Sequence, residues 1–289
     1  MTEALDPFGA PIRRSARLSD QETADRMLDT AVGMVNESGL QVSYGLLRLE
    51  DVIAAAGVSR SAVYRRWPTK NHFFADLMKR LAGEDHPGAV AYDTATIEQV
   101  TTFGLEHLDW FTTPGDRRKL LVELCRQGAL QNFEAIVGSP EWHIYIALNA
   151  TVLSLPDNEL EHDMRAALGS SEEAFVAKMT TFYEAMVGLL GFRLRDDAIP
   201  GATYRTLTTL GASVVEGLSI NTISTPEVAS TRFTADPFDT GLTAEWSLPA
   251  LGYTGVALTL LEPDETQGEW DRSRLEAVRE LLARLRDAA

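Results

Sequence analysis

Residues 49–78 read LEDVIAAAGVSRSAVYRRWPTKNHFFADLM, and this stretch decides the expected fold of the N-terminal part of the chain. Its first residues place apolar side chains at helical spacing, and Gly57 is positioned to end this short helix. Ser59 can cap a second helix, and Val58 and Val63 stand at the two positions of a hydrophobic staple. Two short helices joined by a tight turn that contains Gly are typical of a helix-turn-helix.

One face of the second helix carries polar side chains. Arg60, Ser61, Tyr64 and Arg65 share it, at positions i, i+1, i+4 and i+5. In a helix-turn-helix the second helix enters the major groove, where its N-terminal side chains reach base edges and later ones reach phosphates. We therefore expect Arg60 and Ser61 to contact bases. Tyr64, Arg65 and Arg66 are expected to contact phosphates.

The next helix is expected to begin at Thr69 and carries a lysine in its first turn. Pro68 ends the preceding helix after Trp67, whose indole is expected on the buried side with Val63. A lysine gains nothing from the helix dipole at an N-terminus, so Lys70 points to a bound anion such as a phosphate. Taken alone, a solvated lysine beside a loop would be the better interpretation, but beside Tyr64, Arg65 and Arg66 we favour a phosphate contact.

Charge is segregated along the chain, whose net charge is −16. Residues 10–82 hold 11 basic and 8 acidic side chains, whereas residues 83–289 hold 15 basic and 32 acidic ones. Binding to phosphates needs Lys and Arg, so only the first of these segments has a balance suited to nucleic acid. The acidic remainder would discourage non-specific adhesion to DNA.

Breaks in the pattern divide the chain into three expected parts. Residues 1–18, with the basic cluster RRSAR, are expected to form a flexible arm that is either solvated or touches DNA. Residues 19–85 are expected to form the helix-turn-helix domain, whose first helix starts with a Ser19–Glu22 capping box and ends at Gly39. Residues 86–289 are expected to form a helical regulatory and dimerisation domain.

The fold class expected from these parts is all-α, a three-helix head joined to a larger helical body. Ser170 and Glu173 have capping-box spacing and predict a break at Gly169. Residues 225–270 form an atypical extension, in which the run ALGYTGVALTLL fits either a helix or a strand. The other body helices are expected at Thr96–Thr112, Gly115–Gln131, Glu141–Ser154, Asn158–Leu168, Ser171–Leu190, Ala202–Ile223 and Leu275–Ala288.

The stretch from Asp20 to Ala82 resembles the tetracycline-repressor (TetR) family of transcriptional regulators. The run AGVSRSAVYRRWPTKNHFF carries the resemblance through its Ala-Gly-Val-Ser, the Tyr five residues after that Ser, the following aromatic and the Thr-Lys helix start. The resemblance implies a homodimer in which each head reads one half of a near-palindromic operator. It also implies a helical body that binds a small molecule and then releases the DNA.

Matching positions assign roles within the head. Ser59 would cap the recognition helix, bases would face Arg60, Ser61 and Ala62, and phosphates would be held by Tyr64, Arg65 and Lys70. The chain departs from the family at Arg48, where a Ser or Thr usually caps the second helix, and it continues well beyond the usual last helix. The full set of expected DNA contacts is Arg48, Ser59, Arg60, Ser61, Ala62, Tyr64, Arg65, Arg66, Thr69 and Lys70.

Two further sites are expected in the body. One apolar stripe resembles the dimerising helices of the family, although a helix inside the subunit would have the same pattern; it comprises Leu207, Leu210, Gly211, Val214 and Leu218. A pocket for an unknown small-molecule effector is expected among aromatic and polarizable residues, most of which would also suit a plain core. They are Phe103, Trp110, Phe111, Phe133, Trp142, Tyr145, Phe182, Tyr183 and Met186.

Several functional classes lack a signal in the sequence. We find no G-x-S-x-G, P-loop, G-x-G-x-x-G or H-E-x-x-H pattern, so no enzyme and no cofactor are expected. His107, His143 and His162 are scattered, which argues against a metal site. The single cysteine, Cys125, suits a reducing cytoplasm, and no apolar run is long enough for a membrane helix. The alternative to a ligand-responsive repressor is a DNA-binding activator or architectural protein without a ligand.

Overall fold

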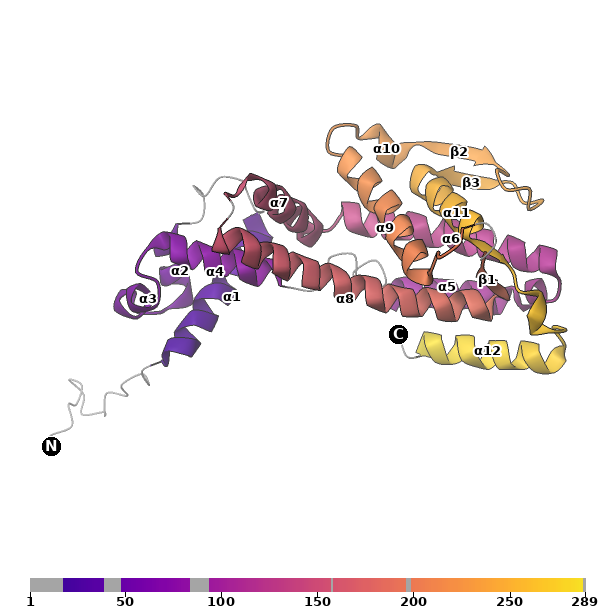
Figure 1. Cartoon of the computed structure of the whole chain (residues 1–289), viewed down its shortest axis with the longest axis horizontal. Helices are drawn as coiled ribbons and strands as arrows, with labels where there is room; N and C mark the ends of the chain where they lie inside the picture. The colour runs from indigo at the N-terminus through magenta and orange to yellow at the C-terminus, as the bar shows by residue number, and fades with distance from the viewer. Residues whose placement is uncertain (1–17, 39–47, 84–93, 157, 196–198, 288–289) are drawn as a thin grey trace, which may run out of the picture. The chain divides into compact units, whose positions relative to one another are not determined.

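The computed structural model describes residues 18–38, 48–83, 94–156, 158–195 and 199–287 (Figure 1). The chain divides into two compact units. The first comprises Met1–Ala82 with Ala147–Arg165, and the second comprises Gly83–Ile146 with Ala166–Ala289. Residues 1–17 of the expected arm at 1–18 and the expected helix end at Gly39 lie outside the described residues.

The first unit is built on helix α1 (Asp20–Ser38), which packs against α2 (Leu49–Ala56), α3 (Arg60–Arg66) and α4 (Lys70–Ala82). Its first turn holds the predicted capping box, because the Glu22 amide donates to Ser19 Oγ at 3.1 Å and the Ser19 amide donates to Glu22 Oε2 at 2.7 Å. Gly57 adopts φ +64°, a left-handed conformation that favours glycine and ends α2 as expected.

The second unit is mostly helical. Its core helices are α5 (Thr94–Glu106), a 3-10 turn (Leu108–Phe111), α6 (Pro114–Val137) and α9 (Tyr204–Asn221). Two helices, α7 (Pro140–Ser154) and α8 (Glu159–Leu189), contribute residues to both units. Together these elements make the chain all-α, with little sheet among the described residues.

The predicted break at Gly169 is wrong, because α8 runs without interruption from Glu159 to Leu189. A Cβ added at Gly169 would meet nothing within 4 Å, so this glycine serves neither a turn nor a close approach. Phe175, Val176 and Met179 beyond it are buried. Burial of such side chains outweighs the cost of about 1 kcal/mol for a glycine inside a helix.

The extension at residues 225–270 is an integral part of the second unit. The ambiguous apolar run forms α11 (Leu248–Leu260), which packs on α6 and α9. Its N-cap is Ser247, whose side chain accepts a hydrogen bond from the Ala250 amide. The remaining elements are α10 (Glu227–Ser230), strands β2 (Arg232–Ala235), β3 (Ala244–Ser247) and β4 (Leu261–Pro263), a 3-10 turn (Glu265–Gln267) and α12 (Arg272–Asp287).

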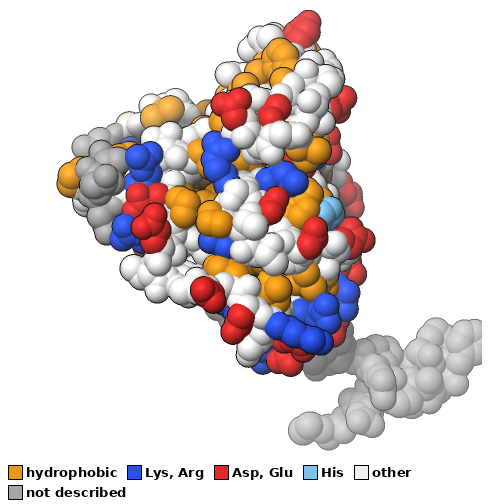
Figure 2. Space-filling view, turned by 90° about the vertical axis from the view of Figure 1, so that its right-hand side faces the viewer, with side chains coloured by type: hydrophobic (Ala, Val, Ile, Leu, Met, Phe, Trp, Pro, Cys, Tyr) orange, Lys and Arg blue, Asp and Glu red, His pale blue; other side chains and the backbone are white. Residues whose placement is uncertain are grey.

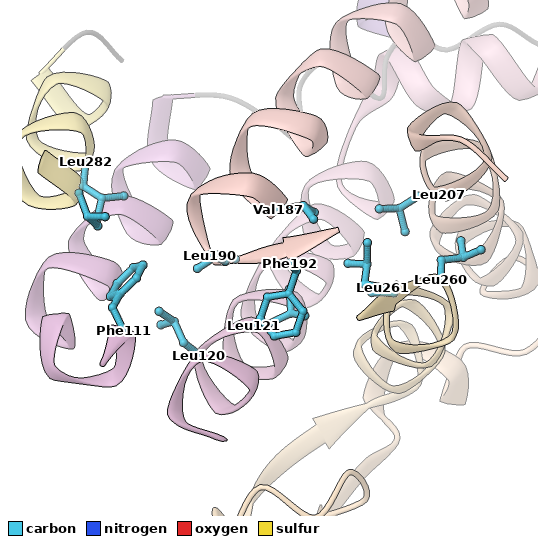
Figure 3. Close-up of a cluster of buried hydrophobic side chains, with 12 residues drawn as sticks. Phe111, Leu120, Leu121, Val187, Leu190, Phe192, Leu207, Leu260, Leu261 and Leu282 are labelled. Atoms are coloured by element: carbon cyan, nitrogen blue, oxygen red, sulfur yellow. The ribbon is translucent and has the colours of Figure 1, made fainter. Parts of the chain in front are cut away.

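Two small two-stranded antiparallel sheets connect these segments. Strand β1 (Phe192–Leu194) pairs with β4, and β2 pairs with β3 so that Phe233 lies opposite Trp246. The main core cluster draws side chains from far apart in the sequence, including Phe111, Leu121, Phe192 and Leu261 (Figure 3). The extension therefore completes the core of this unit.

On the face shown in Figure 2, acidic and basic side chains are interspersed with apolar ones. Within the described residues, none of the helices is both long enough and apolar enough to cross a membrane.

Candidate nucleic-acid interface and internal cavity

The position of α3 is fixed at both ends by residues of the head. Ser59 adopts an extended conformation and its Oγ accepts a hydrogen bond from the Ala62 amide at 3.3 Å, as the sequence predicts. Val63 and Trp67 are buried, with 0% and 1% of their surfaces exposed. The Trp67 indole packs edge-on against Phe73 at 5.1 Å between centroids, which joins α3 to α4.

The ten predicted contact residues lie on the outside of the head. Ala62 is half-buried and the other nine are exposed, namely Arg48, Ser59, Arg60, Ser61, Tyr64, Arg65, Arg66, Thr69 and Lys70. The hydroxyl of Tyr64 lies 3.4 Å from Glu50 Oε1, which brings α3 beside the first turn of α2 next to Arg48. The side chain of Arg48 makes no cap for α2, as its chemistry requires. Their roles in binding stay predictions.

Carboxylates face two of these arginines. Arg65 forms an ion pair with Asp20 at the start of α1. Arg66 lies 3.5 Å from Asp76 Oδ2, which also accepts a hydrogen bond from Trp67 Nε1 at 2.8 Å. Both arginines are exposed and Asp76 is half-buried; ion pairs this open to solvent are each worth less than about 1 kcal/mol, so a phosphate can displace them.

The start of α4 differs from α3 in its neighbours. Thr69 Oγ1 lies 2.9 Å from His72 Nδ1, a contact within the first turn of the helix. Among the described residues, neither Arg60 nor Lys70 has an ion-pair partner. Two cations of the head are therefore free of protein carboxylates at the places where the sequence predicts a base contact and a phosphate contact.

Comparison with known proteins identifies the head. Residues 40–77, which include α2, α3 and most of α4, match the sequence model of the bacterial regulatory proteins of the tetR family. This match assigns residues 40–77 to the tetR-family domain and supports a DNA-binding transcriptional regulator.

The other comparisons add little to this assignment. A solved structure titled as a "putative transcriptional regulator" from Rhodococcus sp. RHA1 is 15% identical to this chain. The match covers 71% of this chain and 89% of the Rhodococcus chain, with a TM-score of 0.39. A similarity of this size carries no argument. No curated protein matches the chain.

The second unit contains a partly open cavity of about 100 Å³. It is lined by side chains of α5, α6, α8, α9 and α11 and by Leu261 of β4. Most of the lining is aliphatic or aromatic, including Leu121, Ile136, Phe175, Met179 and Leu207. Concave apolar sites with a few polar groups are where proteins bind small molecules.

The structure brings only part of the predicted pocket to this cavity. Phe182, Tyr183 and Met186 line it. Phe133, Trp142 and Tyr145 belong to a separate core cluster around Val215. Phe103, Trp110 and Phe111 lie in or against the main core cluster, where the His107 ring lies 4.2 Å from Phe103 and 4.4 Å from Trp110 between ring centroids.

Sequence reasoning missed the polar lining of the cavity, which comprises Cys125, Asn132, Thr208 and Glu216. A signal for Asn132 was present, because it falls on the apolar face of α6 with Leu121, Cys125 and Ile136. Thr208 is buried and donates its hydroxyl to the Tyr204 carbonyl at 2.9 Å. Burial raises the pKa of the Cys125 thiol to about 12, so this thiol stays protonated at neutral pH.

The predicted dimerisation stripe on α9 divides between two sides. Leu207 and Gly211 are buried and line the cavity, and a Cβ added at Gly211 would lie 2.6 Å from the Tyr253 ring of α11. Leu210 is 47% exposed. Val214 and Leu218 are half-buried and line a shallow surface groove between α9 and α11.

Proposed function

We propose that this protein is a TetR-family, ligand-responsive repressor that binds a near-palindromic operator as a homodimer in the cytoplasm. The observation that carries the proposal is the two-sidedness of α3. Val63 and the following Trp67 are buried in the head, while Arg60, Ser61, Tyr64 and Arg65 are exposed. This is the arrangement that lets a recognition helix enter the major groove without disturbing the core.

The proposed contacts differ in their chemistry. Arg60 and Ser61 occupy the first turn of α3 and would read base edges, together with the methyl group of Ala62. Phosphates would be held further along α3 by Tyr64, Arg65 and Arg66, and on either side of it by Arg48, Ser59, Thr69 and Lys70. The backbone amides at the start of α4 would add to the attraction of Lys70 for a phosphate.

The proposed dimer uses the outward side of α9. Leu210, Val214 and Leu218 lie there, and Val214 and Leu218 border a groove shared with Leu251 of α11. Leu207 and Gly211 would support the interface from inside the subunit rather than contact the partner. Gly217, beside the stripe, leaves open space where a partner helix could approach closely.

The test of the DNA-binding proposal is selection of binding sites from random duplexes, followed by affinity measurements at several salt concentrations. We expect a near-palindromic motif with half-sites about 34–36 Å apart or a multiple of that distance. The Arg60→Ala variant should lose preference at one position of each half-site, by about 1–3 kcal/mol. An unchanged motif would show that Arg60 reads no base, and the absence of any motif would favour an architectural protein.

Phosphate contacts are tested separately by the salt dependence. Lys70→Ala should weaken binding to all sequences alike and reduce the slope of log K against log salt by about 0.9 for each lost contact. Arg279→Ala is the matched control, because Arg279 is an exposed basic residue of α12 in the second unit. Equal slopes for Lys70→Ala and the unsubstituted protein would remove Lys70 from the interface.

A further inference from the structure

The cavity of the second unit has two chemically different ends. Helices α6 and α9 run alongside each other, since Leu121 and Leu207 share the main core cluster while Ile136 and Val215 share another. Leu121 and Ile136 both line the cavity and are about 22 Å apart along α6. The lining therefore follows a long path between the two clusters.

The end near the main core cluster is apolar. Leu121, Leu190, Leu207 and Leu261 line it, and each of them is buried. This end can accept the hydrocarbon part of a ligand, because burial of hydrocarbon away from water is favourable. It offers no charged group to a ligand.

The opposite end carries the amide of Asn132 and the carboxylate of Glu216. Asn132 precedes Ile136 by one helical turn, and Glu216 follows Val215 directly, so both residues lie toward the second cluster. Asn132 Oδ1 is buried and has no hydrogen-bond partner in the described structure. A buried carbonyl without a partner is unfavourable, and a ligand that donates a hydrogen bond to it would recover that free energy.

The charge of the residues that line the cavity determines which kind of hydrogen-bond-donating ligand it favours. Glu216 is the one charged residue among the described residues that line the cavity, which include no Lys, Arg or His. Cys125 adds no charge, because its thiol stays protonated. An anionic ligand would be buried there without a countercharge, which is strongly unfavourable. An ammonium group can donate to both the Glu216 carboxylate and the Asn132 carbonyl.

We infer that the cavity binds an elongated apolar amine, with its ammonium group at the Asn132–Glu216 end and its hydrocarbon toward Leu121 and Leu261. This inference rests on the proposed function, in which a ligand of the second unit controls DNA binding. It names the chemical class of that ligand. Fatty carboxylates are excluded by the same argument.

The experiment compares octylamine, 1-octanol and octanoate, which share one hydrocarbon chain and differ in the head group. Binding to the full chain is measured by titration calorimetry and by the shift in melting temperature. We expect octylamine to bind at least tenfold more tightly than 1-octanol, and octanoate to bind most weakly, because a charge-assisted hydrogen bond is worth about 1.5–3 kcal/mol. Octanoate binding as tightly as octylamine would overturn the inference.

Substitutions locate the ammonium group. Glu216→Gln should reduce octylamine affinity about tenfold and leave 1-octanol affinity unchanged. Glu184→Gln is the matched control, since Glu184 is an exposed residue of α8 that does not line the cavity. Equal effects of the two substitutions would contradict the assignment. If Glu216→Gln does not fold, the ligand series on the unsubstituted protein still decides the matter.

A second variant tests the cavity itself. Gly128 lines the cavity, and a Cβ added there would meet nothing within 4 Å, so a leucine has room to enter it. Gly128→Leu should abolish binding of octylamine and 1-octanol alike while leaving the affinity for DNA intact. Unchanged amine binding in this variant would place the amine site elsewhere.

DNA release separates this inference from the proposed function. If octylamine binds with the expected selectivity but does not weaken operator binding, the ligand class stands and the proposal of a ligand-responsive repressor fails. If the operator is bound and no selectivity for the amine appears, the DNA-binding proposal stands and the inference about the ligand fails.

Discussion

The head and the cavity assemble their candidate functional residues in different ways. In the head, Ser59, Arg60 and Tyr64 lie within one short stretch, and a cap and a helical repeat decide where each side chain lies. In the cavity, Asn132, Glu216 and Leu261 come from two helices and a strand that only tertiary packing brings together. Local helix geometry thus positions the side chains of the head, whereas packing of the core of the second unit positions those of the cavity.

This difference predicts that damage to each site should stay within its own unit, and the largest effect is expected in the head. Trp67→Ala removes a buried indole that packs against Phe73 and donates a hydrogen bond to Asp76. It should cost about 3–5 kcal/mol of stability in the head. The melting temperature of the head, measured by calorimetry, and the affinity for DNA should both fall, while ligand binding by the second unit persists.

Tyr64→Ala is the control for that prediction, because Tyr64 is an aromatic residue of the same helix with 43% of its surface exposed. It should leave the unfolding of the head almost unchanged and weaken DNA binding alone. Loss of ligand binding in Trp67→Ala would show that the two sites depend on one another for their folding.

The same difference explains what the sequence could predict. The capping box at Ser19, the Ser59 cap and the burial of Val63 and Trp67 follow from patterns a few residues long, and the structure confirms them. The Gly169 prediction failed because a capping-box spacing says nothing about whether the helix is also held by distant contacts. The run that forms α11 was ambiguous, because period alone does not separate a buried helix from a buried strand.

The cavity was predictable only in part for a related reason. Phe182, Tyr183 and Met186 lie on α8 facing it, but Phe133 and Trp142 have the same composition and pack elsewhere. Residue type alone cannot distinguish a cavity wall from a filled core. Asn132 was the better signal, since a polar residue on an apolar helix face needs a partner.

The thiol of Cys125 offers a chemical measure of how closed the cavity is. With a pKa of about 12, the thiol should react with iodoacetamide at pH 8 at least roughly thirty times more slowly than in the unfolded chain. The fraction of thiolate is much smaller in the folded protein, and this loss exceeds the gain from the higher nucleophilicity of each thiolate. The rate is measured by mass spectrometry in buffer and in urea. Similar rates in both would mean that water reaches the thiol in the folded protein.

Gly211 tests whether α11 supports the cavity. An added Cβ would lie 2.6 Å from the Tyr253 ring, so Gly211→Ala should force these helices apart and destabilise the second unit by about 1–3 kcal/mol. Gly188→Ala is the matched control in α8, where an added Cβ meets nothing within 4 Å. The two melting temperatures should move in opposite directions, and a stabilised Gly211→Ala would show that Tyr253 yields freely.

The smallest effect is expected at the surface of the head. Asp20 pairs with Arg65, so a phosphate that Arg65 binds has to displace this carboxylate. Asp20→Asn should tighten DNA binding by a few-fold at most, because an exposed pair is worth less than about 1 kcal/mol. The matched control is Asp29→Asn, which removes an exposed carboxylate of the same helix that pairs with Arg80 of α4 instead. Equal gains in affinity from both substitutions would mean that the net charge of the head governs DNA binding. A gain from Asp20→Asn alone that disappears when Arg65→Ala is added would show that Asp20 and a DNA phosphate compete for Arg65.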